Sequence, residues 1–193
     1  MRSENAAALR VVVIIGSTRE GRLGDTIGDW FVEQARRRAD IDPSTVDLAG
    51  FDFPASYPLV ASDGMLDFVQ RIERADGFVV VTPEYNRSFP ASLKQAIDYA
   101  YDEWHAKPVG FVSYGCRSTG LYAVEQLRAV FTELHVVTMR DSVSFNLLDG
   151  DVDDTGAPLE AATRGRLGQA VNTMLDQLVW WGRALRAARP YIC

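Results

Sequence analysis

The sequence predicts a single α/β domain built on a doubly wound, five-stranded parallel sheet with helices on both faces. Short apolar runs rich in β-branched residues alternate with longer amphipathic stretches, and each run ends in glycine, proline or small polar residues. Runs such as VVVIIG and GFVVVT are apolar on both faces, as expected for strands that helices cover on either side. Strict alternation of strand and helix then favours a parallel sheet.

The expected elements follow one another in a regular order. Each apolar run is followed by an amphipathic stretch, and right-handed crossovers place successive strands parallel in one sheet. The predicted strands are Leu9–Ile15, Val46–Leu48, Gly77–Val81, Pro108–Ser113 and Val136–Met139. The predicted helices are Leu23–Ala39, Met65–Ala75, Ser92–Ala100, Leu121–Leu134 and Leu159–Ala188.

Length and composition agree with one folded domain. The chain has 193 residues, of which 47% are hydrophobic and 24% charged. A chain of this size buries about 70% of its extended surface without a disulfide or a metal. We expect one domain over residues 1–193, with residues 1–8 flexible. The acidic segment Leu148–Gly156 is expected to be a solvated loop, since it lacks calcium-loop spacing.

Charge and cysteine content narrow the function classes. The net charge of −6 argues against nucleic acid as the main partner, because phosphate-backbone binding relies on a basic face. The sequence has no run of about 18 apolar residues and no signal-peptide pattern. Cys116 and Cys193 are too few for a disulfide framework or a metal cluster. We therefore expect a cytoplasmic protein without a metal, membrane or nucleic-acid partner.

The first strand runs into a loop that suits a phosphate group. Residues Gly16–Gly24 read GSTREGRLG and precede a helix, so backbone N–H groups and a helix N-terminus converge on one space. Two hydroxyls and a guanidinium, from Ser17, Thr18 and Arg19, suit a terminal monophosphate such as that of FMN. From this loop alone, an ordinary glycine-rich turn is an equal alternative.

Two other phosphate motifs fit the first loop less well. A P-loop needs Lys and then Ser or Thr where this chain has Arg22 and Leu23, so the magnesium ligand is missing. A dinucleotide fingerprint needs a second glycine where this chain has Thr18. The loop therefore favours a monophosphate over a nucleoside triphosphate or a dinucleotide.

Two further loops are expected at the same edge of the sheet. Residues Thr82–Pro90 read TPEYNRSFP and offer main-chain groups, the ring of Tyr85 and the amide of Asn86 to a bound flavin. Residues Tyr114–Gly120 form a third, glycine-bearing loop. Each loop alone is explained by turn formation. Three such loops after neighbouring strands indicate a binding site.

At this point the sequence resembles the NADPH-dependent FMN reductase family, which includes azo, quinone and chromate reductases. The resemblance rests on TPEYNRSFPASLKQAIDY at Thr82–Tyr99, followed by KPVGFVSYG at Lys107–Gly115. The stretch GSTREGR at Gly16–Arg22 is similar to the family's phosphate loop. The match extends from about Val11 to about Met139. It implies a flavodoxin-like fold with strand order 2-1-3-4-5 and FMN as cofactor.

The resemblance also implies an activity and a set of site residues. NAD(P)H would pass a hydride to N5 of FMN, which then reduces a quinone, azo compound, metal oxyanion or free flavin, so no protein nucleophile is expected. Family members are commonly homodimers or homotetramers, which implies a partner contact at Tyr101–His105. The residues placed at the FMN phosphate are Ser17, Thr18, Arg19 and Arg22, and those placed around the ring are Pro83, Glu84, Tyr85, Asn86, Ser113, Gly115, Cys116 and Ser118.

The third loop departs from the family pattern and keeps a second hypothesis open. Relatives carry glycines where this chain has Cys116–Thr119, and the added side chains narrow the space over the ring. The alternative is an FMN-binding pathway enzyme or redox sensor that does not turn over with nicotinamide. A magnesium-dependent ATP or GTP hydrolase is a third hypothesis. Arg19, Arg87 and Arg117 are candidates for binding the extra phosphate of NADPH.

Overall fold

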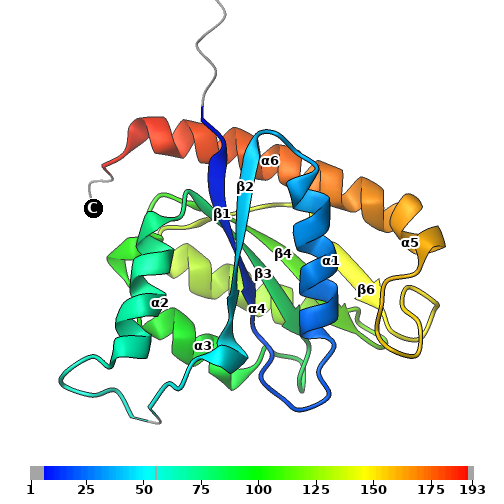
Figure 1. The fold of residues 1–193 in the computed structure, drawn as a ribbon, viewed down its shortest axis with the longest axis horizontal. Helices are drawn as coiled ribbons and strands as arrows, with labels where there is room; N and C mark the ends of the chain where they lie inside the picture. The colour runs from blue at the N-terminus through cyan, green and yellow to red at the C-terminus, as the bar shows by residue number, and fades with distance from the viewer. Residues whose placement is uncertain (1–6, 55, 191–193) are drawn as a thin grey trace, which may run out of the picture.

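The sheet has the predicted parallel order. The computed structural model describes residues 7–54 and 56–190. Its strands follow the order β2-β1-β3-β4-β5, a sixth strand also pairs with β4, and all these ladders are parallel (Figure 1). The predicted flexibility of residues 1–8 falls largely on residues 1–6, outside the described residues. The carbonyls of Ala7 and Ala8 accept hydrogen bonds from Arg186.

The elements alternate along the chain as the sequence pattern predicts. The strands are β1 (Leu9–Ile15), β2 (Ile41–Asp47), β3 (Gly77–Pro83), β4 (Pro108–Gly115), β5 (Val137–Thr138) and β6 (Val143–Asn146). The helices are α1 (Gly24–Arg36), α2 (Asp63–Arg74), α3 (Ala91–Asp98), α4 (Leu121–Glu133), α5 (Glu160–Arg164) and α6 (Arg166–Ala188), with short 3-10 turns at Leu48–Gly50 and Asp102–Trp104.

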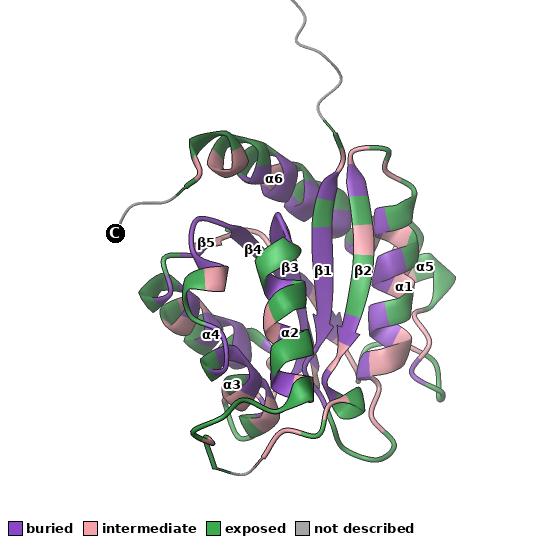
Figure 2. Cartoon of the chain, turned by 60° about the vertical axis from the view of Figure 1, so that its left-hand side comes forward, coloured by how far each residue is buried: buried purple, intermediate pink, exposed green. Residues whose placement is uncertain are grey.

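Helices cover both faces of the sheet because successive side chains of a strand point to opposite sides. Val12 and Ile14 of β1 pack in one cluster with α2, α3 and α4. Val11 and Val13 pack in a second cluster with α1 and α6. Figure 2 shows β1 buried along most of its length, whereas α2 is buried only on the side that faces the sheet. The unbroken apolar runs of the sequence therefore reflect burial on two faces.

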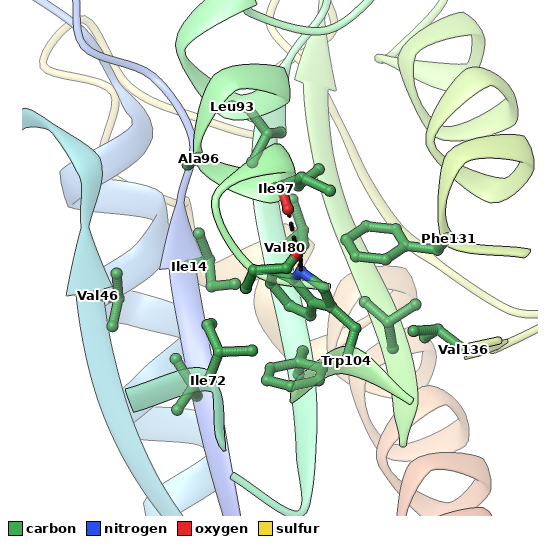
Figure 3. Packing of buried hydrophobic residues seen from close by; sticks show 14 of the residues in the cluster. Ile14, Val46, Ile72, Val80, Leu93, Ala96, Ile97, Trp104, Phe131 and Val136 are labelled. Carbon is green, nitrogen blue, oxygen red and sulfur yellow. Dashed lines mark hydrogen bonds between the residues drawn. The ribbon is translucent and has the colours of Figure 1, made fainter. Parts of the chain in front are cut away.

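The turn before β4 delivers the largest fully buried side chain, Trp104. Its ring lies 4.7 Å from Phe78 and 5.5 Å from Phe131 between centroids. Its Nε1 donates to the carbonyls of Ile97 and Ala100 at 3.1 and 3.0 Å (Figure 3). Because a buried indole N–H needs an acceptor, this contact joins the end of α3 to the core beneath the sheet.

The fifth position of the sheet differs from the prediction. The expected strand Val136–Met139 is reduced to β5, which pairs with Pro108 and Val109, while β6 pairs with the other end of β4. Between β5 and β6, the carbonyls of Met139 and Arg140 accept hydrogen bonds from Arg128 of α4 instead of ladder partners. The described sheet therefore has six strands rather than five, with two short strands sharing one position.

Two further boundaries also differ from the prediction. β2 begins five residues before the predicted Val46, because its exposed polar residues and Pro43 suit an edge strand but hide it in an apolar pattern. The predicted helix Leu159–Ala188 is interrupted at Gly165, whose non-helical backbone (φ −98°, ψ −119°) ends α5 before α6 begins. None of the described helices is long and apolar enough to cross a membrane.

The acidic loop is less solvated than predicted. Asp151 is buried, and its carboxylate accepts hydrogen bonds from the backbone N of Asn146 at 2.7 Å and from Arg166 at 2.5 Å. Asp153 and Asp154 of the same segment are exposed. One carboxylate of the segment therefore joins the end of β6 to the start of α6, and the others face solvent.

Asp76 lies buried just before β3, at the amino edge of the sheet, and three arginines surround it. Its side chain is 3% exposed and lies 3.3 Å from Arg10, 3.1 Å from Arg189 and 3.5 Å from Arg186. Burial alone would raise the pKa of Asp76, but hydrogen bonds from Arg10 and the nearby guanidinium charges hold it below its ordinary value. The carboxylate thereby joins β1 and β3 to the end of α6.

Replacing Asp76 by Asn should lower the free energy of unfolding by about 2 kcal/mol at neutral pH, because the arginines lose their shared carboxylate. The pKa of Asp76 is depressed by folding, so its stabilising contribution is complete above the ordinary Asp pKa of about 3.9 and disappears as the pH falls through the folded pKa. Denaturant unfolding of both proteins at neutral pH and in steps below about pH 4 measures this difference.

Asp67→Asn is the control for this comparison. Asp67 forms an ion pair with Arg71 in which both side chains are 49% exposed, and such a pair contributes about 0.5 kcal/mol or less. If Asp76→Asn costs no more than Asp67→Asn, the arginine cluster does not stabilise the fold.

Candidate functional site

Three loops meet at the carboxyl edge of the sheet because β1, β3 and β4 are neighbours and parallel (Figure 1). The first loop covers residues 16–23, the second 84–90 and the third 116–120. The backbone N of Gly16 donates to the carbonyl of Val81 at 2.9 Å, and that of Glu84 to Tyr114 at 3.2 Å. The pairing thus continues past the strand ends and brings the starts of the loops together.

The first loop lies between two helix N-termini. α1 begins at Gly24 and α3 at Ala91, and both follow strands that end at this edge. The hydroxyl of Ser92 donates to the carbonyl of Gly16 at 3.2 Å and accepts from Thr18 Oγ1 at 3.3 Å, which joins the loop to α3. The positive ends of both helix dipoles therefore point to the edge that carries the loop, which favours an anion there.

Arg22 braces the first loop. Its guanidinium forms two hydrogen bonds of 2.5 Å to Asp47 and one of 2.6 Å to the carbonyl of Ser17. The hydrogen bonds that Arg22 donates to Asp47 raise the pKa of Arg22 and outweigh the opposite effect of burial. That Arg22 also binds the phosphate stays a prediction. Its observed hydrogen bonds show that it supports the backbone of the first loop.

Arg19 links the first loop to the second. Its guanidinium carbon lies 3.7 Å from the centre of the Tyr85 ring, which is cation–π geometry. The side chain is exposed, and its charge is at the mouth of the site. The structure therefore brings together two predicted site residues that are far apart in the sequence.

Two buried hydroxyls at the start of α1 have no protein hydrogen-bond partner among the described residues. They are Ser17 Oγ and Tyr114 OH. Both lie beside Gly24, where a Cβ would clash with Ser17 Oγ and lie 2.8 Å from Tyr114 OH. Burial is the largest cause acting on the pKa of Tyr114 and raises it. Sequence reasoning missed Tyr114, although it belongs to the YG pair that marks the third loop.

The second loop contains a tight two-residue turn in a strained conformation. Tyr85 and Ser88 exchange backbone hydrogen bonds of 2.8 and 3.0 Å, and Asn86 and Arg87 between them have φ of 52° and 64°. Positive φ at both central residues defines a type I′ turn, which favours Asn and Gly. Arg at such a position costs roughly 1 kcal/mol or more. Backbone strain of this kind is concentrated at functional sites.

Glu84 has a structural partner that the sequence did not reveal. Its carboxylate accepts a hydrogen bond of 3.1 Å from the backbone N of Tyr122, in the first turn of α4. A carboxylate at a helix N-terminus satisfies a free N–H and is favoured by the helix dipole. Glu84 therefore joins the second loop to α4. Pro83 is buried as the last residue of β3.

The third loop is held against the end of β4. Ser113 is fully buried and donates to the carbonyl of Thr119 at 2.8 Å. Gly120 has φ of 86°, and a Cβ there would lie 2.5 Å from Ser113 Cβ, so only glycine fits. Gly115 and Ser118 are half-buried, whereas Cys116 and Arg117 are exposed. Ser113 thus positions the loop, and the exposed pair is presented to solvent at its tip.

The residues at this edge fit a flavin that ends in a phosphate. Ser17 Oγ is buried and has no protein partner within residues 7–54 and 56–190, as expected for a hydroxyl that donates to a ligand anion. The glycine at position 24 leaves room beside it, and the N-terminus of α1 adds free backbone N–H groups. The turn of the second loop and the backbone of Gly115 supply groups for a ring edge. FMN, when bound, would supply the hydride and electron-transfer chemistry.

The strand order, with helices on both faces of the parallel sheet, defines the class: this is a flavodoxin-like protein. Residues 9–147 match the family described as NADPH-dependent FMN reductase. The chain belongs to this family. FMN is therefore its flavin and NAD(P)H its electron donor, which confirms the predicted cofactors and enzyme class.

Individual relatives agree with the family. A 2-hydroxy-1,4-benzoquinone reductase of Burkholderia sp is 31% identical over 192 residues, covering 93% of this chain and 99% of the relative. An NAD(P)H-dependent FMN reductase of Schizosaccharomyces pombe is 39% identical over 122 residues, which span 58% of this chain and 60% of that protein. The fold matches the flavoenzyme NAD(P)H:(acceptor) oxidoreductase of Paracoccus denitrificans with a TM-score of 0.70 and 24% identity, covering 89% and 97% of the two chains.

The Tyr114 hydroxyl has no hydrogen-bond partner in the described part of the chain, so removing it should stabilise the protein instead of destabilising it. Tyr114→Phe should raise the free energy of unfolding of the flavin-free protein by about 0.5–1 kcal/mol, because a buried hydroxyl without a partner is removed at constant shape. Ser113→Ala is the matched control in the same strand and should lower it by about 1 kcal/mol, because its hydroxyl is bonded. Denaturant unfolding of the flavin-free proteins measures both, and a loss of stability in Tyr114→Phe would contradict this assignment.

Proposed function

We propose that this chain is an NAD(P)H-dependent, FMN-containing oxidoreductase whose electron acceptors are quinones. The observation that carries the proposal is the buried, unpartnered Ser17 hydroxyl at the N-terminus of α1, on the edge where the three loops meet. The quinone acceptor is supported by the Burkholderia relative, which is aligned over almost its whole length. Azo compounds, metal oxyanions and free flavin are further acceptors in the proposal.

The protein's part in this reaction is binding and orientation. Ser17, Thr18 and Arg19 hold the phosphate together with the amides of the first loop, and Arg22 keeps that loop in place. Tyr85 and Asn86 line the ring from the second loop, with Pro83 and Glu84 behind them. The ring-side residues predicted in and beside the third loop are Ser113, Gly115, Cys116 and Ser118. No side chain is required to act as a nucleophile, because the reacting atoms belong to the cofactors.

The geometry favours Arg117 as the contact for the extra phosphate of NADPH. Arg19 is stacked on Tyr85, and the guanidinium of Arg87 lies 3.9 Å from the ring centre of Tyr122. Arg117 is exposed at the tip of the third loop. A guanidinium there is available for bidentate contact with a phosphate.

We extend the proposal to assembly and location. Tyr57, Leu59 and Val60 form an apolar segment before α2, with exposed fractions of 69, 107 and 82%. Such a contiguous apolar segment is typical of a protein interface, which supports a homodimer or homotetramer. Tyr101 is also exposed, whereas His105 of the predicted partner contact is buried. A cytoplasmic location agrees with the low cysteine content.

The test of the proposed function is a flavin spectrum followed by anaerobic reduction. The purified chain with FMN should show the visible absorbance of bound flavin, and NADPH or NADH should bleach it within seconds. Addition of a benzoquinone should then restore the colour. If FMN binds and neither nucleotide bleaches it, the alternative hypothesis of a redox sensor or a nicotinamide-independent pathway enzyme replaces the proposal. If no flavin binds, the assignment of the first loop is wrong.

Arg117→Ala should lower the ratio of kcat/KM for NADPH to that for NADH about 5–10-fold, because one charge-assisted contact to the extra phosphate is lost. Most of the change should appear in the KM for NADPH. Arg36→Ala, which removes an exposed ion pair with Glu33 on α1, should leave the ratio unchanged. An unchanged ratio in Arg117→Ala would remove this residue from nucleotide selection.

A further inference from the structure

One exposed polar side chain of α4, Gln126, holds the second half of the turn in the second loop. Its Nε2 donates to the carbonyl of Arg87 at 2.8 Å, and its Oε1 accepts from the hydroxyl of Ser88 at 2.5 Å. Arg87 and Ser88 form the second half of the strained turn. One amide therefore satisfies a carbonyl and a hydroxyl of the same turn, which fixes the orientation of that turn relative to α4.

Two further contacts join the same surfaces. Tyr122 precedes Gln126 by four residues, so the two side chains lie on one face of α4. The ring of Tyr122 receives the guanidinium of Arg87 at 3.9 Å, and its backbone N donates to Glu84. The segment from Glu84 to Ser88 is thus held at its beginning, centre and end by residues in the first two turns of α4.

The attachment to α4 also fixes the second loop relative to the third loop. α4 begins directly after the third loop, and Gly120 packs on Ser113 at the end of β4. A turn fixed to the first two turns of α4 is therefore fixed relative to the third loop as well. Loops that are held in this way keep their groups in one geometry, which lowers the cost of ordering them around a ligand.

We infer that Gln126 is a positioning residue for flavin binding, which acts by holding the Tyr85–Ser88 turn in the geometry that receives the isoalloxazine ring. The inference rests on the proposed function, since it concerns the ring end of the same site. The phosphate end is held by other groups, namely Ser17 and the start of α1. Among the described residues, Gln126 forms no hydrogen bond with these groups. Loss of Gln126 should therefore weaken binding of the ring and leave binding of the phosphate intact.

The experiment compares FMN with riboflavin, which has the same ring and no phosphate. Gln126→Leu should weaken the binding of both ligands by the same factor, about 5-fold, so that the ratio of the two dissociation constants stays that of the unmodified protein. Ser17→Ala should do the reverse, weakening FMN and leaving riboflavin unchanged. Gln169→Leu, at an exposed position of α6, is the control for an exposed glutamine and should change neither constant.

A double-mutant cycle separates positioning from a general effect on stability. Ser88→Ala removes one of the two bonds that Gln126 makes, so the combined variant should bind riboflavin no more weakly than Gln126→Leu alone. The visible circular dichroism of bound riboflavin should change in Gln126→Leu and not in Gln169→Leu. Unchanged riboflavin affinity in Gln126→Leu, or a loss confined to FMN, would overturn the inference. Failure of the unmodified chain to bind any flavin would overturn the proposed function first.

Discussion

Parallel pairing of β1, β3 and β4 is the constraint on which the rest of the structure depends. These strands are adjacent and buried on both faces, and their register places Ile15 opposite Val81 and Thr82 opposite Ser113. Because parallel strands end at the same edge, the three loops that follow them meet there whatever their separation in the sequence. The site is therefore a product of the sheet order, and the loops supply only its chemistry.

The parts of the structure that were predictable from the sequence are those that depend on local pattern. Burial on two faces produces unbroken apolar runs such as Val11–Ile15, and these runs predicted a parallel sheet. The strand order was implied by the family resemblance, which rested on the loop motifs. The prediction failed where tertiary contacts override the pattern. β2 is an edge strand with polar residues, and Arg128 of α4 takes the carbonyls of Met139 and Arg140 that would otherwise extend β5.

At the site, the sequence indicated which residues lie near one another but not what each side chain contacts. Arg22 binds a carboxylate from the end of β2, Glu84 accepts from the first turn of α4, and Tyr114 directs its hydroxyl beneath the first loop. Each of these contacts joins elements that are distant in sequence, so no spacing rule identifies it. The YG pair at Tyr114 and Gly115 could have indicated Tyr114. From the sequence, Gly115 was assigned to the site and the tyrosine before it was not considered.

In the proposed function, the two ends of the flavin are held by different elements, and this separation has a physical reason. A phosphate is a compact anion, so it is stabilised by fixed dipoles and buried hydroxyls, which the start of α1 provides without strain. A flavin ring is broad and must be contacted along one edge by main-chain groups, which requires an irregular turn. Two non-glycine residues at positive φ make that turn unfavourable in isolation, so its conformation has to be stabilised by neighbours. Gln126 and Tyr122 supply that stabilisation from the first two turns of α4, and Glu84 supplies it from the start of the loop itself.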